Sequence, residues 1–257
     1  MVTYIAGGLL GDFIHSLSVC KSIFDATGQK AIVLISDHVG DRFKFGAQKA
    51  YEDLRTLLTA QEYIAEFRVY ANEPYDINLT QWRQSPLLYR ATWDIIYNTC
   101  YQLSDWGQRA WIIPTQPTQQ LTEYKDTIFF NSSMLRFVAS FPYQHMMQLI
   151  TSKQRKCMFL CFHPNDAFAF FERAGIKMDI CVVKDINDMA NHIMACHAFI
   201  GNLSSPLAIC IACNKYCMGI LGEHTGDGIH MKNVPIPNYN YWCDAQSYSK
   251  SLEEFLI

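Results

Sequence analysis

Two short loops, one near each end of this 257-residue chain, carry the residues whose types and spacing could do chemistry. The first, Gly-Gly-Leu-Leu-Gly-Asp-Phe-Ile-His at residues 7–15, follows an apolar run and precedes an amphipathic stretch. The second, Gly-Asn-Leu-Ser-Ser-Pro at residues 201–206, lies between the apolar runs 198–200 and 207–213. Each pattern predicts a strand, a tight turn and a helix N-terminus, whose unpaired N–H groups and positive dipole end suit an anion. The sequence therefore predicts two Rossmann-like halves that face a shared cleft.

The composition predicts a folded globular protein that binds a small soluble ligand. Of its residues, 50% are hydrophobic and 18% are charged, which is enough to build one large or two small cores. A net charge of -3 without a long basic run argues against a nucleic-acid partner. No apolar stretch approaches the roughly 20 residues that span a bilayer, and the first residues do not read as a signal peptide. We expect a soluble protein in the cytoplasm whose cysteines are reduced.

Apolar periodicity predicts an α/β chain with two parallel sheets. Strands at residues 2–6 and 31–35 flank a helix at residues 13–26, which is how a doubly wound sheet begins. Residues 112–120 contain two prolines among Thr and Gln without apolar periodicity, and we take them as a linker.

The linker predicts a first domain at residues 1–118 and a second at residues 119–257, in which strands and helices alternate again. Ser249, followed by Leu-Glu-Glu-Phe at residues 252–255, predicts a capped final helix. We expect this helix to pack back on the first domain.

The first loop also has an alternative interpretation. Residues 6–11 fit the dinucleotide fingerprint G-x-G-x-x-G with its first glycine replaced, and Asp37 ends the second predicted strand, where such folds place a ribose-binding acid. This pattern indicates an NAD- or FAD-dependent oxidoreductase. Against it, the chain has no Tyr-x-x-x-Lys pair, and the fingerprint explains neither Asp12 nor His15. A third interpretation is structural, with glycines that only make a turn and Asp12 as a helix cap.

Three motifs together resemble one family. Gly-Asp-Phe-Ile-His-Ser-Leu at residues 11–17 resembles the Gly-Asp-x-Ile-His-x-Leu-Pro opening of bacterial heptosyltransferases, glycosyltransferase family 9. Residues 199–207 are similar to that family's Gly-Asn-Asp-Ser-Gly-Pro-x-His loop. Between them, the predicted strand 127–130 runs into Asn-Ser-Ser and then Arg136, like the first strand and polar loop of the family's donor domain. The order and spacing of the three motifs cover nearly the whole chain.

The resemblance implies a GT-B fold, in which two Rossmann-like domains with parallel sheets face a central cleft. It implies a metal-independent, inverting transfer of a sugar from a nucleotide-diphosphate donor to a hydroxyl of a glycan or lipid-linked acceptor, without a cofactor. Asp12 would be the general base, and His15 would orient Asp12 or touch the acceptor. Gly8 and Gly11 would belong to the acceptor-side loop. The chain also has no Asp-x-Asp pair of the kind that holds a metal on a donor diphosphate.

On the donor side, the resemblance implies phosphate- and nucleotide-binding roles for a larger set. Arg136 would supply a cation and the second loop its serines and N–H groups to the leaving diphosphate. The expected donor-side residues are Asn131, Ser132, Ser133, Arg136, Gly201, Asn202, Ser204 and Ser205. Glu223 is added from its position, because it follows the predicted strand 217–221 and could contact the ribose or the base.

Three residues depart from the family's second motif. Leu203 stands where the family has an aspartate, Ser205 where it has a glycine, and Ala208 where it has a histidine. A catalytically degenerate GT-B protein that only binds its ligand is therefore a further alternative. Because the acceptor class includes lipid-linked glycans, we also allow for a peripheral contact with a membrane.

Overall fold

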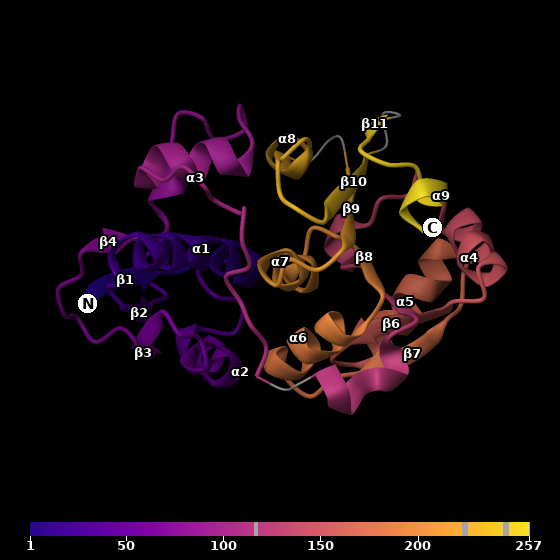
Figure 1. Ribbon diagram of the computed structural model, residues 1–257, viewed down its shortest axis with the longest axis horizontal. Coiled ribbons are helices and arrows are strands. Elements are labelled where there is room, and N and C mark those ends of the chain that lie inside the picture. The colour runs from indigo at the N-terminus through magenta and orange to yellow at the C-terminus, as the bar shows by residue number, and fades with distance from the viewer. Residues whose placement is uncertain (116–117, 223–225, 244–246, 257) are drawn as a thin grey trace.

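The computed structural model describes residues 1–256 with three gaps, at 116–117, 223–225 and 244–246. Figure 1 shows two sheets side by side, each flanked by helices, with α1 and α7 between them. The α/β class with two sheets of mainly parallel strands, predicted from the sequence, is confirmed.

The first sheet is built from short apolar strands in the order β3-β2-β1-β4, all of them parallel. Near-continuous apolar strands of this kind are typical of a parallel sheet buried on both faces. Its strands are β1 (Val2–Ala6), β2 (Ala31–Ile35), β3 (Ile64–Val69) and β4 (Ile77–Asn78); its helices are α1 (Leu10–Thr27), α2 (Ala47–Thr59), the 3₁₀ turn η1 (Gln81–Gln84) and α3 (Trp93–Tyr101).

The second sheet has the order β11-β10-β9-β8-β5-β6-β7 and is parallel except at β11. Its strands are β5 (Thr127–Asn131), β6 (Lys156–Cys161), β7 (Asp179–Val182), β8 (Ala198–Asn202), β9 (Cys217–Leu221), β10 (Tyr239–Cys243) and β11 (Ser247–Tyr248). Its helices are η2 (Thr118–Tyr124), η3 (Met134–Arg136), α4 (Tyr143–Ser152), α5 (Pro164–Ala174), α6 (Ile186–Ala195), α7 (Ser205–Ala212), α8 (Gly226–Met231) and α9 (Leu252–Phe255).

Both sheets reverse their strand order at one point, and ligands of open α/β sheets bind beyond the carboxyl ends of the strands at such a point. In the first sheet the reversal lies between β1 and β4, and in the second between β5 and β8. The turns after β1 and β8 are the two loops singled out in the sequence.

The two halves share one continuous apolar core, in which α1 packs against α7. The segment between the sheets runs along this contact. The indole N–H of Trp111 donates to the carbonyl of Ile14 at 2.8 Å, and the backbone N–H groups of Trp111 and Ile112 donate to the carbonyl of Ala212 at 2.9 and 3.1 Å. The turns that follow β1 and β8 are therefore held close together.

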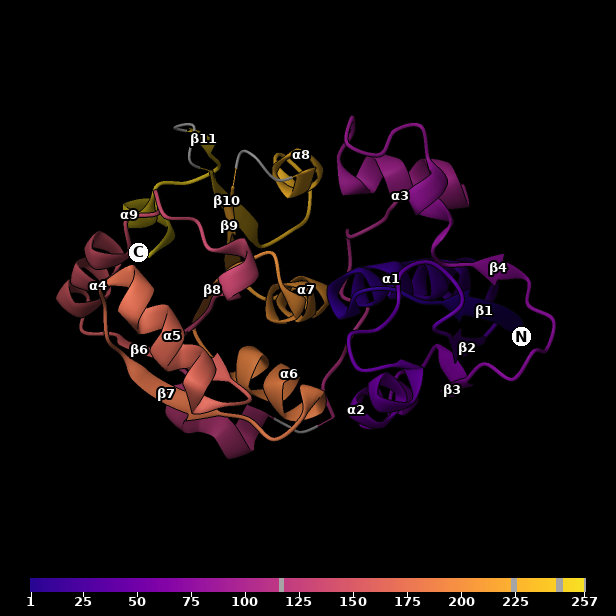
Figure 2. The same ribbon diagram turned by 180° about the vertical axis from the view of Figure 1, so that it is seen from behind.

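One expectation about packing is wrong. The final helix α9 does not return to the first sheet; its Leu252 and Phe255 are buried in the core on the other face of the second sheet. Phe255 stacks on Tyr216 with ring centroids 4.6 Å apart. The helix is capped as predicted, but the cap is Ser251, which forms a capping box with Glu254, and not Ser249. This arrangement is clear in Figure 2, where α9 lies beside α4 at the far end from α1.

Two further observations concern the chemistry of the chain as a whole. All ten cysteines lie in the described residues, none is in a disulfide, and nine are buried. No helix among the described residues has the length and apolar character needed to cross a membrane.

Candidate active site

A cavity of about 860 Å³ lies between the two halves of the molecule. The turns after β1, β5, β6, β7 and β8 and the segment before α2 form its walls. The first half contributes Asp12 and His15, and the second contributes Ser133, Arg136, Ser204 and Ser205. The structure thus brings residues from all three sequence motifs to one cavity.

Asp12 lies in the first turn of α1 and is bound by an arginine that the sequence analysis did not identify. Its Oδ2 atom is 2.6 Å from Nη2 of Arg83, which belongs to η1. The other terminal nitrogen of Arg83, Nη1, is 2.6 Å from Oδ2 of Asp41. Burial raises the pKa of Asp12 above its usual value, although the charges of Arg83 and Arg136 oppose that increase. A carboxylate with a raised pKa is a better general base.

His15 is buried between two tryptophans. Its ring centroid is 6.0 Å from that of Trp106 and 6.4 Å from that of Trp111, and only 6% of the residue is exposed. Its Nδ1 atom has no hydrogen-bond partner in the described structure, and burial lowers its pKa to about 4. The imidazole is therefore neutral near pH 7 and stands at the cavity wall without a hydrogen bond to Asp12.

The N-terminus of α7 forms the opposite wall. Ser204 precedes the helix in an extended conformation, and its hydroxyl donates to Asn131 Oδ1 at 3.3 Å and to the carbonyl of Asn202 at 3.2 Å. Pro206 has no N–H, so the first-turn donors are the N–H groups of Ser205 and Leu207. With Arg136 on the same cavity, this wall combines a guanidinium with the positive end of a helix.

Asn202 has a different role from the ligand contact expected of it. It is 1% exposed, and its Oδ1 accepts from the N–H of Ser133 at 2.9 Å. Its Nδ2 donates to Ser132 Oγ and to the carbonyls of Ser133 and Arg136, at 3.0, 2.8 and 2.9 Å. Asn202 therefore fixes the loop that carries Ser133 and Arg136 to the end of β8.

Other members of the expected donor-side set also support the cavity rather than line it. Asn131 donates to the carbonyl of Leu160 at 2.8 Å, and Ser132 is buried. A Cβ at Gly201 would lie 2.7 Å from the carbonyl oxygen of Asn131, so glycine allows β8 to approach β5. Glu223 lies outside the described residues.

The two glycines of the acceptor-side loop differ in their surroundings. Gly11 lines the cavity, and a Cβ there would lie in ordinary contact, at 3.8 Å, with both the N atom of Ser205 and the Cβ of Ala208. Gly8 adopts a φ of +109°, and a Cβ there would lie 3.1 Å from Nη2 of Arg83. Gly8 therefore leaves room for the guanidinium that holds Asp12.

The geometry disfavours a dinucleotide in the first loop. A Cβ at Gly7 would collide with the carbonyl oxygen of Val39, so the chain after β2 already lies against the turn where a pyrophosphate would approach. Asp37 accepts a hydrogen bond from the N–H of Ala47 at 2.8 Å, at the start of α2, and is not a cavity residue. Asp37, the candidate ribose ligand, therefore uses its Oδ2 atom to bind the first residue of α2.

Arg83 and Asp41 are the site residues that the sequence did not indicate. Arg83 follows β4, a strand of two residues, and lies 71 residues from its partner Asp12. The signal that could have found it is topological, because a strand placed beside β1 delivers its following turn to the same edge of the sheet.

No family model matches the sequence, and no curated protein matches it. Solved structures do match, at low sequence identity. A family 9 glycosyltransferase from Veillonella parvula has a TM-score of 0.65 and 13% identity over 100% of this chain and 93% of its own. The E. coli ADP-heptose LPS heptosyltransferase II has a TM-score of 0.65 and 12% identity over 100% and 96%. E. coli heptosyltransferase WaaC with ADP has a TM-score of 0.54 and 11% identity over 99% and 93%.

These likenesses define the class of fold, which is that of the GT-B glycosyltransferases. Within this class the structures it resembles are those of glycosyltransferase family 9, the family whose motifs the sequence resembles. The match extends over 99–100% of this chain in all three cases.

A first prediction concerns the hydrogen bonds by which Asn202 holds the loop of Ser133 and Arg136. Replacing Asn202 by Ala leaves the N–H of Ser133 and two carbonyls without their buried partner, and we expect a loss of about 2–4 kcal/mol in the free energy of unfolding. Urea unfolding measures it, with Asn165→Ala, an exposed asparagine on α5, as the control. A loss no larger than that of the control would contradict the assigned role.

A second prediction concerns pH. Because the pKa of His15 is about 4 in the folded chain and about 6.5 when unfolded, the unfolded state binds more protons between these values. Stability is therefore fully present above pH 6.5 and falls as the pH drops towards 4, by up to about 3 kcal/mol from this residue. Urea unfolding at pH 7 and pH 4.5 should show a smaller acid loss for His15→Gln than for wild type. The exposed His163→Gln should behave as wild type; an unchanged acid loss in both variants contradicts the prediction.

Proposed function

We propose that the protein is an inverting glycosyltransferase that moves a sugar from a nucleoside-diphosphate donor to a hydroxyl of a glycan or lipid-linked acceptor. The observation that carries the proposal is that Asp12 of the first half and the N-terminus of α7 of the second line the same cavity. A transfer of this kind needs a base on one side of the sugar and a stabilised leaving anion on the other.

Asp12 is the base in this mechanism. The acceptor oxygen attacks the anomeric carbon while the bond from that carbon to the diphosphate oxygen breaks, so the configuration at the anomeric carbon inverts. The acceptor proton passes to the carboxylate of Asp12, and the electron pair of the broken bond leaves on the diphosphate. The raised pKa of Asp12 suits it to take this proton.

The diphosphate is stabilised by the second half of the molecule. Arg136 offers a guanidinium whose planar fork matches phosphate oxygens, and α7 offers the N–H groups of Ser205 and Leu207. Leu203 and Ala208, which replace the family's aspartate and histidine, also line the cavity. On this wall the charge of the diphosphate is therefore met by Arg136, serines and backbone N–H groups.

We propose that the reaction needs no metal ion. Among the described residues, no cluster of three His, Cys, Asp or Glu is arranged to hold one, and Arg136 with the α7 N-terminus can take over charge neutralisation. One structural neighbour, the E. coli heptosyltransferase TibC, is described as iron-containing, so the proposal is open to test by chelation. The ten cysteines, none of which forms a disulfide, favour a reducing compartment, and we place the reaction in the cytoplasm.

The names of the neighbours suggest the donor. WaaC was solved with ADP and with a fluorinated ADP-heptose analogue, and heptosyltransferase II is an ADP-heptose enzyme. We therefore propose a nucleoside-diphosphate sugar as the donor, with ADP-heptose the first to be assayed.

A third prediction tests the base. Replacing Asp12 by Asn preserves the size of the side chain and removes its proton affinity, and we expect transfer to fall by about 10²–10⁴-fold while the chain still binds nucleoside diphosphate. The control is Asp25→Asn, at the other end of α1, which should keep wild-type turnover. Transfer by Asp12→Asn within a few-fold of wild type would remove Asp12 from this role.

A fourth prediction tests the ligand. A nucleoside diphosphate at about one hundred times its Kd should stabilise the fold by about 2.7 kcal/mol, seen as a rise in Tm. Replacing Arg136 by Ala should abolish the rise, whereas Arg155→Ala, at a half-buried position before β6 that does not line the cavity, should not. A rise in Tm with NAD(H) but with none of ADP, UDP and GDP would instead support the oxidoreductase alternative. Donor binding without transfer or hydrolysis of any nucleotide sugar would support the degenerate binding protein.

A further inference from the structure

Arg83 is shared between two carboxylates at the cavity edge. Its Nη2 atom is 2.6 Å from Asp12 and its Nη1 atom 2.6 Å from Asp41, and its guanidinium lies over the ring of Trp82 at 4.4 Å. The two carboxylates differ in exposure, because the side chain of Asp12 is 26% exposed and that of Asp41 is 56% exposed. Only Asp12 lines the cavity.

We propose that Asp41 is a positioning residue that divides the charge of Arg83 with Asp12, so that the base is held in place by an arginine without losing its readiness to accept a proton. This inference rests on the proposed function of Asp12 as the base. Neither Arg83 nor Asp41 touches the reacting atoms in this account; both act through Asp12.

The physical reason is a conflict between orientation and basicity. A bond to an arginine fixes the direction of a carboxylate, but an unshared guanidinium stabilises its charged form and makes it a weaker base. A second carboxylate on the same guanidinium reduces that effect. In agreement, Arg83 lowers the pKa of Asp12 and Asp41 raises it, while burial raises it further.

The fold builds this arrangement from two independent backbone approaches. Gly8 allows the guanidinium to reach Asp12, as described above. Gly40, at a φ of +69°, lies against Thr80, since a Cβ there would be 2.9 Å from the Thr80 Cγ2 atom. This second contact brings the segment after β2, which carries Asp41, onto the turn after β4, which carries Arg83.

Other charged and titratable groups also surround Asp12. Arg136 of η3 lines the same cavity and lowers the pKa of Asp12. Burial lowers the pKa of His230 of α8, whose Nδ1 is 3.0 Å from the carbonyl of Ala91, and raises that of Tyr97 of α3 well above its usual value. His15 of α1 is neutral above pH 4. Among these groups, Asp12 is the one in direct contact with Arg83, so its pKa should respond most directly to changes at Arg83 and Asp41.

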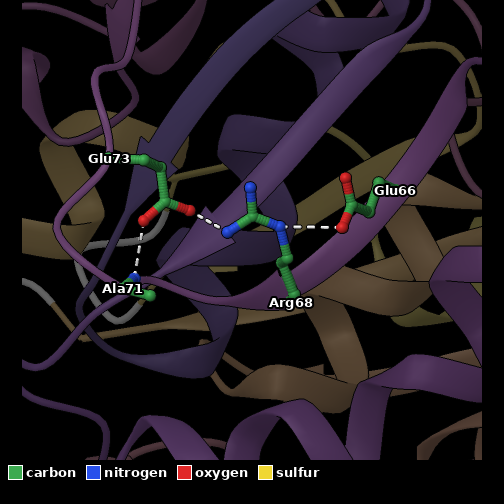
Figure 3. Close-up of polar contacts among 4 residues, drawn as sticks. All are labelled: Glu66, Arg68, Ala71 and Glu73. Atoms are coloured by element: carbon green, nitrogen blue, oxygen red, sulfur yellow. Dashed lines mark hydrogen bonds and ion pairs between the residues drawn. The ribbon is translucent and has the colours of Figure 1, made fainter.

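Figure 3 shows a control of matched chemistry. Arg68 of β3 likewise binds two carboxylates, Glu66 at 2.7 Å and Glu73, and Glu73 also accepts from the N–H of Ala71 at 2.7 Å. None of these residues lines the cavity. Arg68→Gln therefore removes an arginine shared by two carboxylates without touching Asp12.

The test is the pH dependence of kcat/KM for the acceptor in three variants. The acid limb of this profile reports the protonation of the base in the free enzyme. In Asp41→Asn, Asp12 is the remaining carboxylate bound to Arg83, so the pKa of Asp12 should fall. The acid limb of the kcat/KM profile should then move to lower pH, and the plateau value of kcat/KM should decrease. Arg83→Gln removes the attraction, so the limb should move to higher pH, with a loss of about 10- to 100-fold at neutral pH from misplacement of the base. Arg68→Gln should leave the limb where it is in wild type.

A direct titration of the Asp12 carboxyl by ¹³C NMR in the unliganded protein separates this inference from the proposed function. Opposite shifts of its pKa in Asp41→Asn and Arg83→Gln support the sharing of Arg83 even if no transfer is detected. Shifts in the same direction, or no shift in Asp41→Asn, overturn it. Asp41 is exposed, so its variant should fold even if the Arg83 variant does not.

Discussion

The contact between α1 and α7 is the constraint on which the rest of the structure depends. Each helix begins directly after a strand of its own sheet, and Gly11 of α1 lies against the first turn of α7 without a side chain between them. Trp111 fixes the contact from the segment between the sheets by binding both helices. Because the helices meet at their first turns, the groups at those turns, Asp12 and Ser205, line a single cavity.

This contact has an electrostatic consequence. Two helix N-termini and the guanidinium of Arg136 bring positive potential to the same cavity. The negative charge of Asp12 offsets little of this potential, because Asp12 is already paired with Arg83. A bound diphosphate would complete the charge balance, with its oxygens at the α7 turn. Burial and the charge of Asp41 both raise the pKa of Asp12. The second half of the molecule therefore attracts an anion, while Asp12 of the first half remains able to accept a proton.

How much the sequence predicts depends on whether the signal is local. The apolar strands β1 and β2 match the predicted ranges because short β-branched runs between turn residues determine them. The cavity residues Asp12 and Arg136 follow motifs of neighbouring residues. The Arg83 pairing escapes such an analysis, since it arises from strand pairing over 71 residues. The burial of Asn202 is equally hidden, because a motif does not tell a ligand contact from a residue that holds the loop beside it. The placement of α9 depended on core packing, which no local pattern encodes.

A crystal structure with a bound nucleoside diphosphate tests the central claim most directly. The account predicts the β-phosphate within hydrogen-bonding distance of the Ser205 N–H and the Arg136 guanidinium, with space for one sugar ring between it and the Asp12 carboxylate. A diphosphate bound instead at the turn of residues 7–11, or one that leaves Asp12 facing away from it, would contradict the account.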